Sequence, residues 1–333
     1  MKKKLPLIIL QDILLTGLVL CIFALFHHVL PRVNPGPSHA ASAPVVLTPV
    51  PVALTPAPEE AEPSQDEPQY ETPWQEAFAD RFTQETVVTE NSYSSPEISI
   101  TVDTVSTQID GKPLAYYVAD IYISRIENFQ TYVENESFDR FISTPADQLA
   151  QMCGAVVSIN GDYCNTQEQF GFFVRNGVLY DDRQSDGDIC VLYRDGTMAT
   201  YGPKDYTVED VLAQEPYQVW KFGPMLLDAN GQPLEDFNVR GAIGGRNPRS
   251  AVGYYEPGHY CFVVVDGRQK DWSVGLDIQQ LAQLFADLGC KAAYNLDGGA
   301  SATMTFGGEL INRQSKYRQI GDILLIKEVG DQP

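Results

Sequence analysis

The stretch Glu97-Ile98-Ser99-Ile100-Thr101-Val102 alternates apolar and polar residues, as a half-buried β-strand does. The turn signal Asp110-Gly111 follows it, and residues 114–123 have the composition of a returning strand. This segment predicts a β-hairpin near the start of a folded domain.

Further turn signals along the chain predict more antiparallel structure. Asn176-Gly177 separates apolar runs at 172–174 and 178–180, and Asp195-Gly196 separates runs at 191–193 and 198–200. Apolar segments predict strands at 155–159, 219–227, 260–265 and 292–296. Helical spacing predicts a short helix at 74–82 and an amphipathic one at 279–288, the latter ending at Gly289. We therefore expect an α+β fold, with a mixed, largely antiparallel sheet and a few packed helices, forming one globular domain at 74–329.

The N-terminal residues have a different composition. Three lysines, Lys2 to Lys4, precede an apolar run at 5–26 that reaches the roughly 20 residues a bilayer core requires. We expect residues 1–30 to anchor the chain in the membrane; the alternative is a signal peptide cleaved near Ala41-Ser42-Ala43. Residues 31–73 are rich in Pro, Ala and Glu, which predicts a disordered stalk.

The chain has 333 residues and a net charge of −21. This charge argues against nucleic acid as a partner, because binding it relies on Lys and Arg neutralising phosphates. Any anionic substrate must meet a local cluster of cations. None of the six cysteines forms a Cys-x-x-Cys pair, so a zinc site is not expected. The cysteines fit small buried hydrophobic positions, and a Cys153–Cys164 bridge stays open.

Three segments place an aspartate beside glycine at the end of an expected strand: Asn160-Gly161-Asp162-Tyr163, Asp266-Gly267-Arg268 and Asn295-Leu296-Asp297-Gly298-Gly299. Glycine allows a ligand to approach the backbone closely. Only the last segment continues into small, hydroxyl-bearing residues, Ala300-Ser301-Ala302-Thr303, which suit an array of donors around an anion. Each segment alone also fits a plain turn.

Arginines lie near these segments. Arg249 precedes the strand that ends at Asp266, Arg268 follows that aspartate, and Arg318 lies near the C-terminus with Asp322 after it. Arginine binds phosphate through paired hydrogen bonds, although structural Arg–Asp pairing is the alternative for each.

Four segments, taken in chain order, resemble the phosphodiester glycosidase family. They are Asn160-Gly161-Asp162-Tyr163, residues 247–253, residues 263–268 and Asn295-Leu296-Asp297-Gly298-Gly299. The resemblance covers roughly residues 93–327. It departs from the family pattern at Ala300 and Ala302, which replace a glycine and a serine, and at Gln280, where the family often has Glu.

The resemblance implies an extracytoplasmic hydrolase that splits sugar-1-phosphodiesters into free sugar and phosphomonoester, on cell-envelope or exopolysaccharide glycans. Such a hydrolase is expected to need no cofactor, and the presence of a Ca²⁺ or Mg²⁺ ion bound by carboxylates is left open. The phosphorylated glycan and the membrane are the expected partners, and the domain is expected outside the cell. Two alternatives are a non-catalytic glycan-binding protein and a metal-assisted phosphodiesterase. The expected catalytic residues are Asp297, Asp162 and Asp266, and the expected substrate- or phosphate-binding residues are Arg249, Arg268, Asn160, Gly298, Gly299, Ser301, Thr303 and Arg318.

Overall fold

The computed structural model describes residues 45–46, 72–134, 143–163, 171–239 and 243–330. The expected anchor at 1–30 lies outside these ranges, as does nearly all of the expected stalk at 31–73. Within the described ranges, no helix has the length and apolar character needed to cross a membrane.

The strands form three sheets, and every pairing between the described strands is antiparallel. The seven-stranded sheet has the order β15 (Ala292–Asn295), β13 (Arg249–Glu256), β14 (His259–Val265), β5 (Lys112–Ile123), β4 (Ile98–Ile109), β3 (Ser92–Ser94) and β2 (Val87–Val88). The six-stranded sheet has the order β1 (Val45–Val46), β9 (Val178–Asp181), β8 (Phe173–Arg175), β12 (Pro216–Trp220), β10 (Ile189–Tyr193) and β11 (Met198–Tyr201). The five-stranded sheet has the order β17 (Glu309–Leu310), β16 (Met304–Phe306), β7 (Val157–Asn160), β18 (Asp322–Ile326) and β6 (Phe129–Val133).

Four α-helices accompany the sheets in the described residues: α2 (Pro73–Ala77), α3 (Ala146–Cys153), α4 (Val208–Leu212) and α5 (Ile278–Asp287). The expected α+β class and single globular domain are confirmed, with the strands divided among three sheets.

The hairpin expected at 97–123 is present as β4 and β5, joined by Asp110 and Gly111 in left-handed conformations. Ile98, Ile100 and Val102 are buried, so the apolar positions of the alternating pattern face the core.

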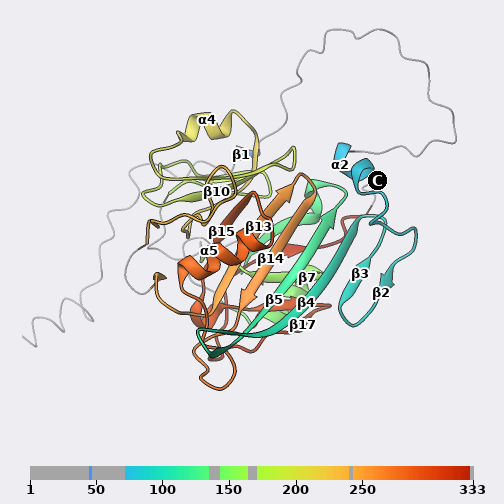
Figure 1. Ribbon diagram of the computed structural model, residues 1–333. Coiled ribbons are helices and arrows are strands. Elements are labelled where there is room, and N and C mark those ends of the chain that lie inside the picture. The colour runs from blue at the N-terminus through green and yellow to red at the C-terminus, as the bar shows by residue number, and fades with distance from the viewer. Residues whose placement is uncertain (1–44, 47–71, 135–142, 164–170, 240–242, 331–333) are drawn as a thin grey trace, which may run out of the picture. The chain divides into compact units, whose positions relative to one another are not determined.

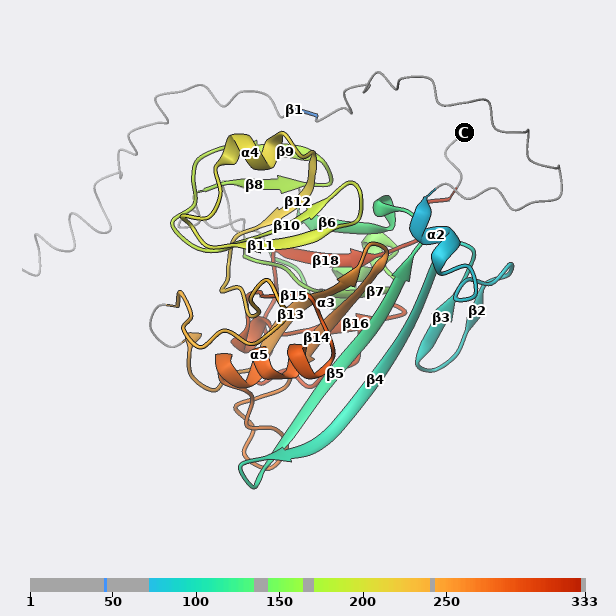
Figure 2. The same cartoon turned by 45° about the horizontal axis from the view of Figure 1, so that its top comes forward.

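The seven-stranded sheet is covered on both faces. Figure 1 shows α5 lying across β13 and β14, where Leu281 and Phe285 pack against Val263 in one hydrophobic cluster. On the opposite face, Phe262 of β14 packs with Phe129 of β6 in a second cluster that also includes residues of β7, β10 and β18. Figure 2 shows these elements on the side of the sheet away from α5. The sheets thus bring the ends of β7, β15 and β18 together.

Two expected elements differ in length from their predictions. The helix expected at 74–82 is the short α2, in which only Trp74 is buried, so little packing supports a longer helix. The strand expected at 219–227 ends at Trp220, and Gly223 then adopts a positive φ of 78° that interrupts the extended backbone.

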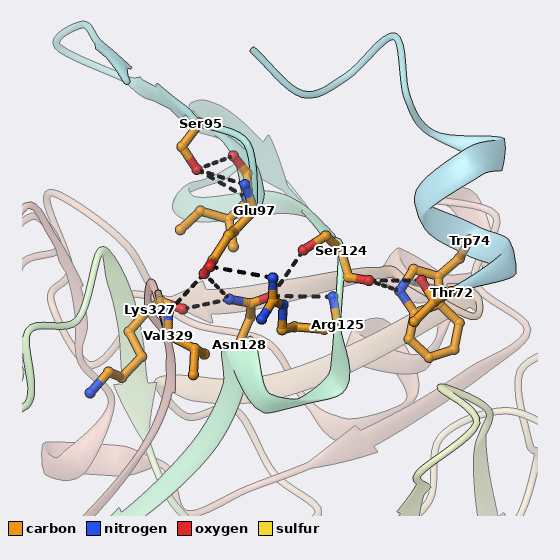
Figure 3. A network of polar contacts seen from close by, with 10 residues as sticks. Thr72, Trp74, Ser95, Glu97, Ser124, Arg125, Asn128, Lys327 and Val329 are labelled. Atoms are coloured by element: carbon orange, nitrogen blue, oxygen red, sulfur yellow. Dashed lines mark hydrogen bonds and ion pairs between the residues drawn. The ribbon is translucent and has the colours of Figure 1, made fainter. Parts of the chain in front are cut away.

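A buried polar network ties the C-terminal segment to the N-terminal hairpin (Figure 3). The Glu97 carboxylate accepts hydrogen bonds from Asn128 Nδ2 at 2.9 Å and from the backbone N–H of Val329 at 2.7 Å. Asn128 Nδ2 also donates to the carbonyl of Lys327 at 3.0 Å. Burial raises the pKa of Glu97, but these hydrogen bonds outweigh it and leave the pKa below its usual value. The network fixes the segment that directly follows β18.

Candidate active site

Asn160 joins the chain segments that form the candidate site. At the end of β7, its Nδ2 donates to the carbonyl of Asp297 at 2.6 Å. Its Oδ1 accepts from Ser250 Oγ at 2.5 Å and from the backbone N–H of Thr303 at 3.2 Å. The backbone N–H of Asp297 donates to the carbonyl of Gly161 at 3.3 Å. The structure therefore brings two of the three Asp-Gly segments together, and Asn160 is a positioning residue buried beneath them.

Asp162 is fully buried and ionised. The guanidinium Nη2 of Arg175 on β8 lies 2.7 and 2.8 Å from its two oxygens, and the backbone N–H of Lys221 donates to it at 3.0 Å. Burial raises the pKa of Asp162, but the positive charge of Arg175 and the Lys221 hydrogen bond outweigh burial and lower it. Arg175, the partner of this candidate, was not among the site residues expected from the sequence.

Asp322, at the start of β18, is a functional candidate that the sequence analysis left out of the site. Its side chain is buried and hydrogen-bonds that of Asp162. Burial first, and then the negative charge of Asp162, raise the pKa of Asp322 well above its usual value. Two carboxyl groups in contact share a proton, and here Asp322 holds it. The dipeptide Gly321-Asp322 was the available signal, but it begins a strand, whereas the other segments end one.

Asp297 is half-buried at the edge of this pair. Burial raises its pKa, opposed by a hydrogen bond from Ser301 and by the charge of Arg318. A small cavity opens here, lined by Asp297, Ser301, Asp322, Arg318 and Tyr163 among others. The cavity therefore presents two carboxyl groups with raised pKa values and one cation.

Arg318 lies at the mouth of the cavity. Its side chain is exposed, and its Cζ lies 5.6 Å from the centre of the Tyr163 ring. Tyr163 adopts a φ of 62°, which is uncommon for a residue with a Cβ. Arg318 is thus a cation able to meet an anionic substrate beside Asp297.

Arg268 lies beside the glycine turn that follows Asp297. It is exposed and donates to Asn247 Oδ1 at 2.7 and 3.2 Å. A Cβ at Gly299 would lie 3.2 Å from an Arg268 Nη, and one at Gly298 would lie 2.7 Å from the carbonyl oxygen of Pro248. The glycines therefore allow close packing here, and Arg268 is a second exposed cation near the site.

Arg249 has a structural environment. It is buried, and its guanidinium donates to three carbonyl groups, those of Leu276, Ile243 and Gly245, at 2.5–3.0 Å. Burial lowers the pKa of Arg249 to about 10. Arg249, which was expected to bind phosphate, therefore holds the loop before β13 against the start of α5.

Asp266 is also placed apart from the cavity. Its carboxylate accepts from Trp272 Nε1 at 2.7 Å, Asn312 Nδ2 at 2.9 Å and the backbone N–H of Arg313 at 3.1 Å. Burial raises the pKa of Asp266, and these donors oppose the rise. It joins the end of β14 to the segment after β17, so the expected catalytic role has no support in its position.

Two of the departures from the family pattern, Gln280 and Ala302, have structural surroundings. The Gln280 side chain accepts from the backbone N–H of Asp277 at 3.2 Å, closing a capping box at the start of α5. Ala302 is buried in the main core. Thr303 is buried, and its Oγ1 has no hydrogen-bond partner. The hydrogen bond between Gln280 and Asp277 thus gives Gln280 a capping role.

The described residues contain no group of three or more His, Cys, Asp or Glu side chains arranged to hold a metal ion. Cys153 is a free thiol, and the bridge considered to Cys164 falls on a residue outside the described ranges.

A family model described as phosphodiester glycosidase matches residues 153–327, which include every site residue from Asn160 to Asp322. The chain belongs to the phosphodiester glycosidase family. Residues 93–152, which the resemblance also covered, lie outside the matched range.

Two solved structures share the fold of this phosphodiester glycosidase family member. The catalytic domain of zebrafish N-acetylglucosamine-1-phosphodiester alpha-N-acetylglucosaminidase, auto-inhibited by its pro-peptide, superposes with a TM-score of 0.57 at 20% identity, covering 73% of this chain and 88% of that one. A hypothetical protein from Synechocystis superposes with a TM-score of 0.54 at 15% identity, covering 70% of this chain and 62% of that one.

Among curated proteins, the SPbeta prophage-derived uncharacterized protein YomE of Bacillus subtilis is 28% identical over 190 residues, 55% of this chain. The match spans 29% of the length of that relative.

Proposed function

We propose that this chain hydrolyses sugar-1-phosphodiesters, releasing the free sugar and a phosphomonoester. The observation that carries the proposal is a cavity lined by Asp297 and Asp322, with Asp162 buried behind it in contact with Asp322. Their environments push their pKa values in opposite directions, down for Asp162 and up for the other two. Neighbouring carboxyl groups with separated pKa values are typical of sites that perform acid–base chemistry.

Asp297 acts at the anomeric carbon, either by attacking it or by activating a water molecule. The bond from that carbon to the phosphate oxygen breaks, and the oxygen leaves with the phosphomonoester. Water supplies the hydroxyl group of the sugar, and its remaining proton goes to the phosphate or the surrounding solvent. Phosphate is a good leaving group, so the main requirement is a carboxylate at the carbon.

Asp322 holds the proton of the buried pair. That proton forms the hydrogen bond to Asp162, so the free carboxyl oxygen of Asp322 is the atom that can accept a hydrogen bond from a sugar hydroxyl in the cavity. Asp162 stays ionised against Arg175 and keeps that proton on Asp322. The pair thus keeps the Asp322 side chain, which lines the cavity, in its protonated and uncharged form.

Arg318 contacts the phosphate in this proposal, with Arg268 as a second cation. The chain has a net charge of −21, so an anionic substrate requires local positive charge. Arg318 lines the cavity and is exposed, which leaves its guanidinium accessible to a phosphate oxygen.

The location of the reaction belongs to the same proposal. Lys2 to Lys4 and the apolar run at 5–26 support a single-pass membrane anchor with the enzyme domain outside the cell. A phosphorylated glycan of the cell envelope, or exopolysaccharide, is then the substrate within reach.

Product analysis in ¹⁸O-labelled water tests the reaction. The purified chain is incubated with a panel of α-sugar-1-phosphodiesters, and both products are analysed by mass spectrometry. Label in the sugar means cleavage between carbon and oxygen, as proposed. Label in the phosphate would show a phosphodiesterase instead. Saturable binding without any product, in a folded protein, would favour a glycan-binding protein.

A further inference from the structure

Two buried cysteines outside the candidate site lie in contact. Cys261 is on β14 and Cys290 lies two residues before β15, and their Sγ atoms are 3.7 Å apart. Both side chains are buried, with 0% and 2% of their surface exposed. A disulfide has an S–S bond of about 2.05 Å, so the sulfur atoms need to approach by about 1.6 Å in total.

The strand between them provides the space for this contact. β13 lies between β14 and β15, and its Gly253 is paired with Cys261 on one side and Ala293 on the other. A Cβ at Gly253 would lie 2.7 Å from Cys261 Sγ and 2.8 Å from Cys290 Sγ. Neighbouring strands are about 4.8 Å apart, so side chains two strands apart rarely meet. Here the missing side chain allows both sulfur atoms to reach across the middle strand.

We propose that Cys261 and Cys290 form a disulfide bond that crosses β13 over Gly253. The reaction requires a small-molecule or protein disulfide as oxidant. One thiolate attacks the oxidant, giving a mixed disulfide and releasing one thiol. The second thiolate then attacks the protein sulfur of that mixed disulfide and releases the other thiol. The two cysteines lose two electrons and two protons, and the oxidant becomes two thiols.

The bond forms during folding. In the folded chain the sulfur atoms lie beneath Phe285 of α5, and burial raises the pKa of the Cys261 thiol well above its usual value. Only the thiolate reacts, so exchange in the folded state is slow. The same burial protects the finished bond from reductants.

The cross-link would stabilise the part of the sheet that leads to the candidate site. It closes the segment between two residues 29 positions apart, which contains α5. β15 begins shortly after Cys290 and leads to Asp297. The inference does not depend on the proposed reaction.

The experiment maps thiols in the full chain. The chain is unfolded in guanidinium and refolded with oxidised and reduced glutathione, and the fold is checked by circular dichroism. It is then denatured, alkylated without reductant, digested and analysed by mass spectrometry. We expect a peptide pair joined through Cys261 and Cys290 in most molecules. Alkylation of both cysteines in most refolded molecules would overturn the proposal.

Thermal unfolding with and without dithiothreitol, added in denaturant before refolding, gives an independent readout. A cross-link of this length predicts that reduction lowers the Tm of the unsubstituted chain by roughly 5–15 °C. The double variant Cys261→Ala with Cys290→Ala should lose this response. The matched control Cys190→Ala, also a buried cysteine, should keep it. An equal Tm with and without reductant in the unsubstituted chain contradicts the bond.

Discussion

The backbone of Gly161 lies directly against the carboxylate of Asp322, so that a Cβ at position 161 would lie 1.9 Å from Asp322 Oδ2. The backbone N–H of Gly161 also donates to the Asp322 carbonyl at 2.9 Å. Glycine is therefore required between Asn160 and Asp162, because it lets β7 and β18 bring two carboxyl groups into contact. The absence of a side chain at Gly161 is thus what allows Asp322 to lie in contact with Asp162.

Gly161→Ala should displace Asp322 and disturb the pair. Since a methyl group cannot share that space, we expect kcat/KM to fall by at least about tenfold, as when a positioned acid or base is lost. Gly187→Ala is the matched control, because a Cβ there has no atom within 4 Å. Steady-state kinetics on both variants, with circular dichroism, separates the two effects. Full activity in Gly161→Ala would refute the importance of this contact.

Asp322→Asn should reduce activity without reducing stability at neutral pH. The folded-state pKa of Asp322 is raised, so its contribution to stability is present below the usual value near 3.8 and is lost as the pH rises through the raised pKa. Asparagine stays neutral and avoids that loss. We therefore expect a smaller decrease in Tm between pH 5 and pH 8 than in the wild type, together with a lower kcat.

The pH profile of the same variant provides the second measurement. If protonated Asp322 is needed, wild-type activity falls on the alkaline side as that proton is lost, and the variant lacks this limb. Asp103→Asn, at an exposed position on β4, is the control. An unchanged alkaline limb in the Asp322 variant contradicts its role as proton holder.

Asp266→Asn should impair stability more than catalysis. The carboxylate accepts from Trp272, Asn312 and Arg313, and an amide places an NH₂ group against at least one of these donors. One unsatisfied buried donor costs about 1–3 kcal/mol, so the denaturant midpoint should fall. Turnover per folded molecule should stay near the wild-type value. A large loss of kcat in folded protein would return Asp266 to the catalytic residues.

Arg318→Ala should weaken substrate binding with little effect on folding, because the side chain is exposed. A hydrogen bond to a charged group contributes about 1.5–3 kcal/mol, which corresponds to roughly a 10- to 150-fold loss in kcat/KM. Lys316→Ala removes a neighbouring exposed charge and is the control. Equal kinetics in the two variants would show that Arg318 does not contact the phosphate.

The sequence predicted local structure well where the signal was local. The alternation at 97–102 and the turns at Asp110-Gly111 and Asn176-Gly177 gave hairpins that the structure confirms. The helix expected at 279–288 is α5, one residue earlier, with Gly289 in the left-handed conformation after it.

Long-range partners could not be predicted in the same way. Asp162 is paired with Arg175 and Asp322, which lie 13 and 160 positions along the chain, and only the sheet pairings bring them together. Asp266 has the same Asp-Gly context as Asp297, but buried donors occupy its carboxylate. Arg249 precedes the strand that ends at Asp266, but backbone carbonyls occupy its guanidinium. The small, hydroxyl-bearing run after Asp297 was the local signal that set this segment apart, whereas the Asp162 and Asp266 segments have no local feature that separates a cavity from a structural network.

The most direct test of the proposed mechanism compares Asp297→Asn with the wild type on a hydrolysed sugar-1-phosphodiester. The side chain is half-buried beside Ser301, and asparagine keeps its shape while removing its charge and basicity. We predict a loss of turnover of at least about 100-fold with an unchanged circular dichroism spectrum. Turnover close to the wild-type rate in the folded variant would contradict the proposed mechanism.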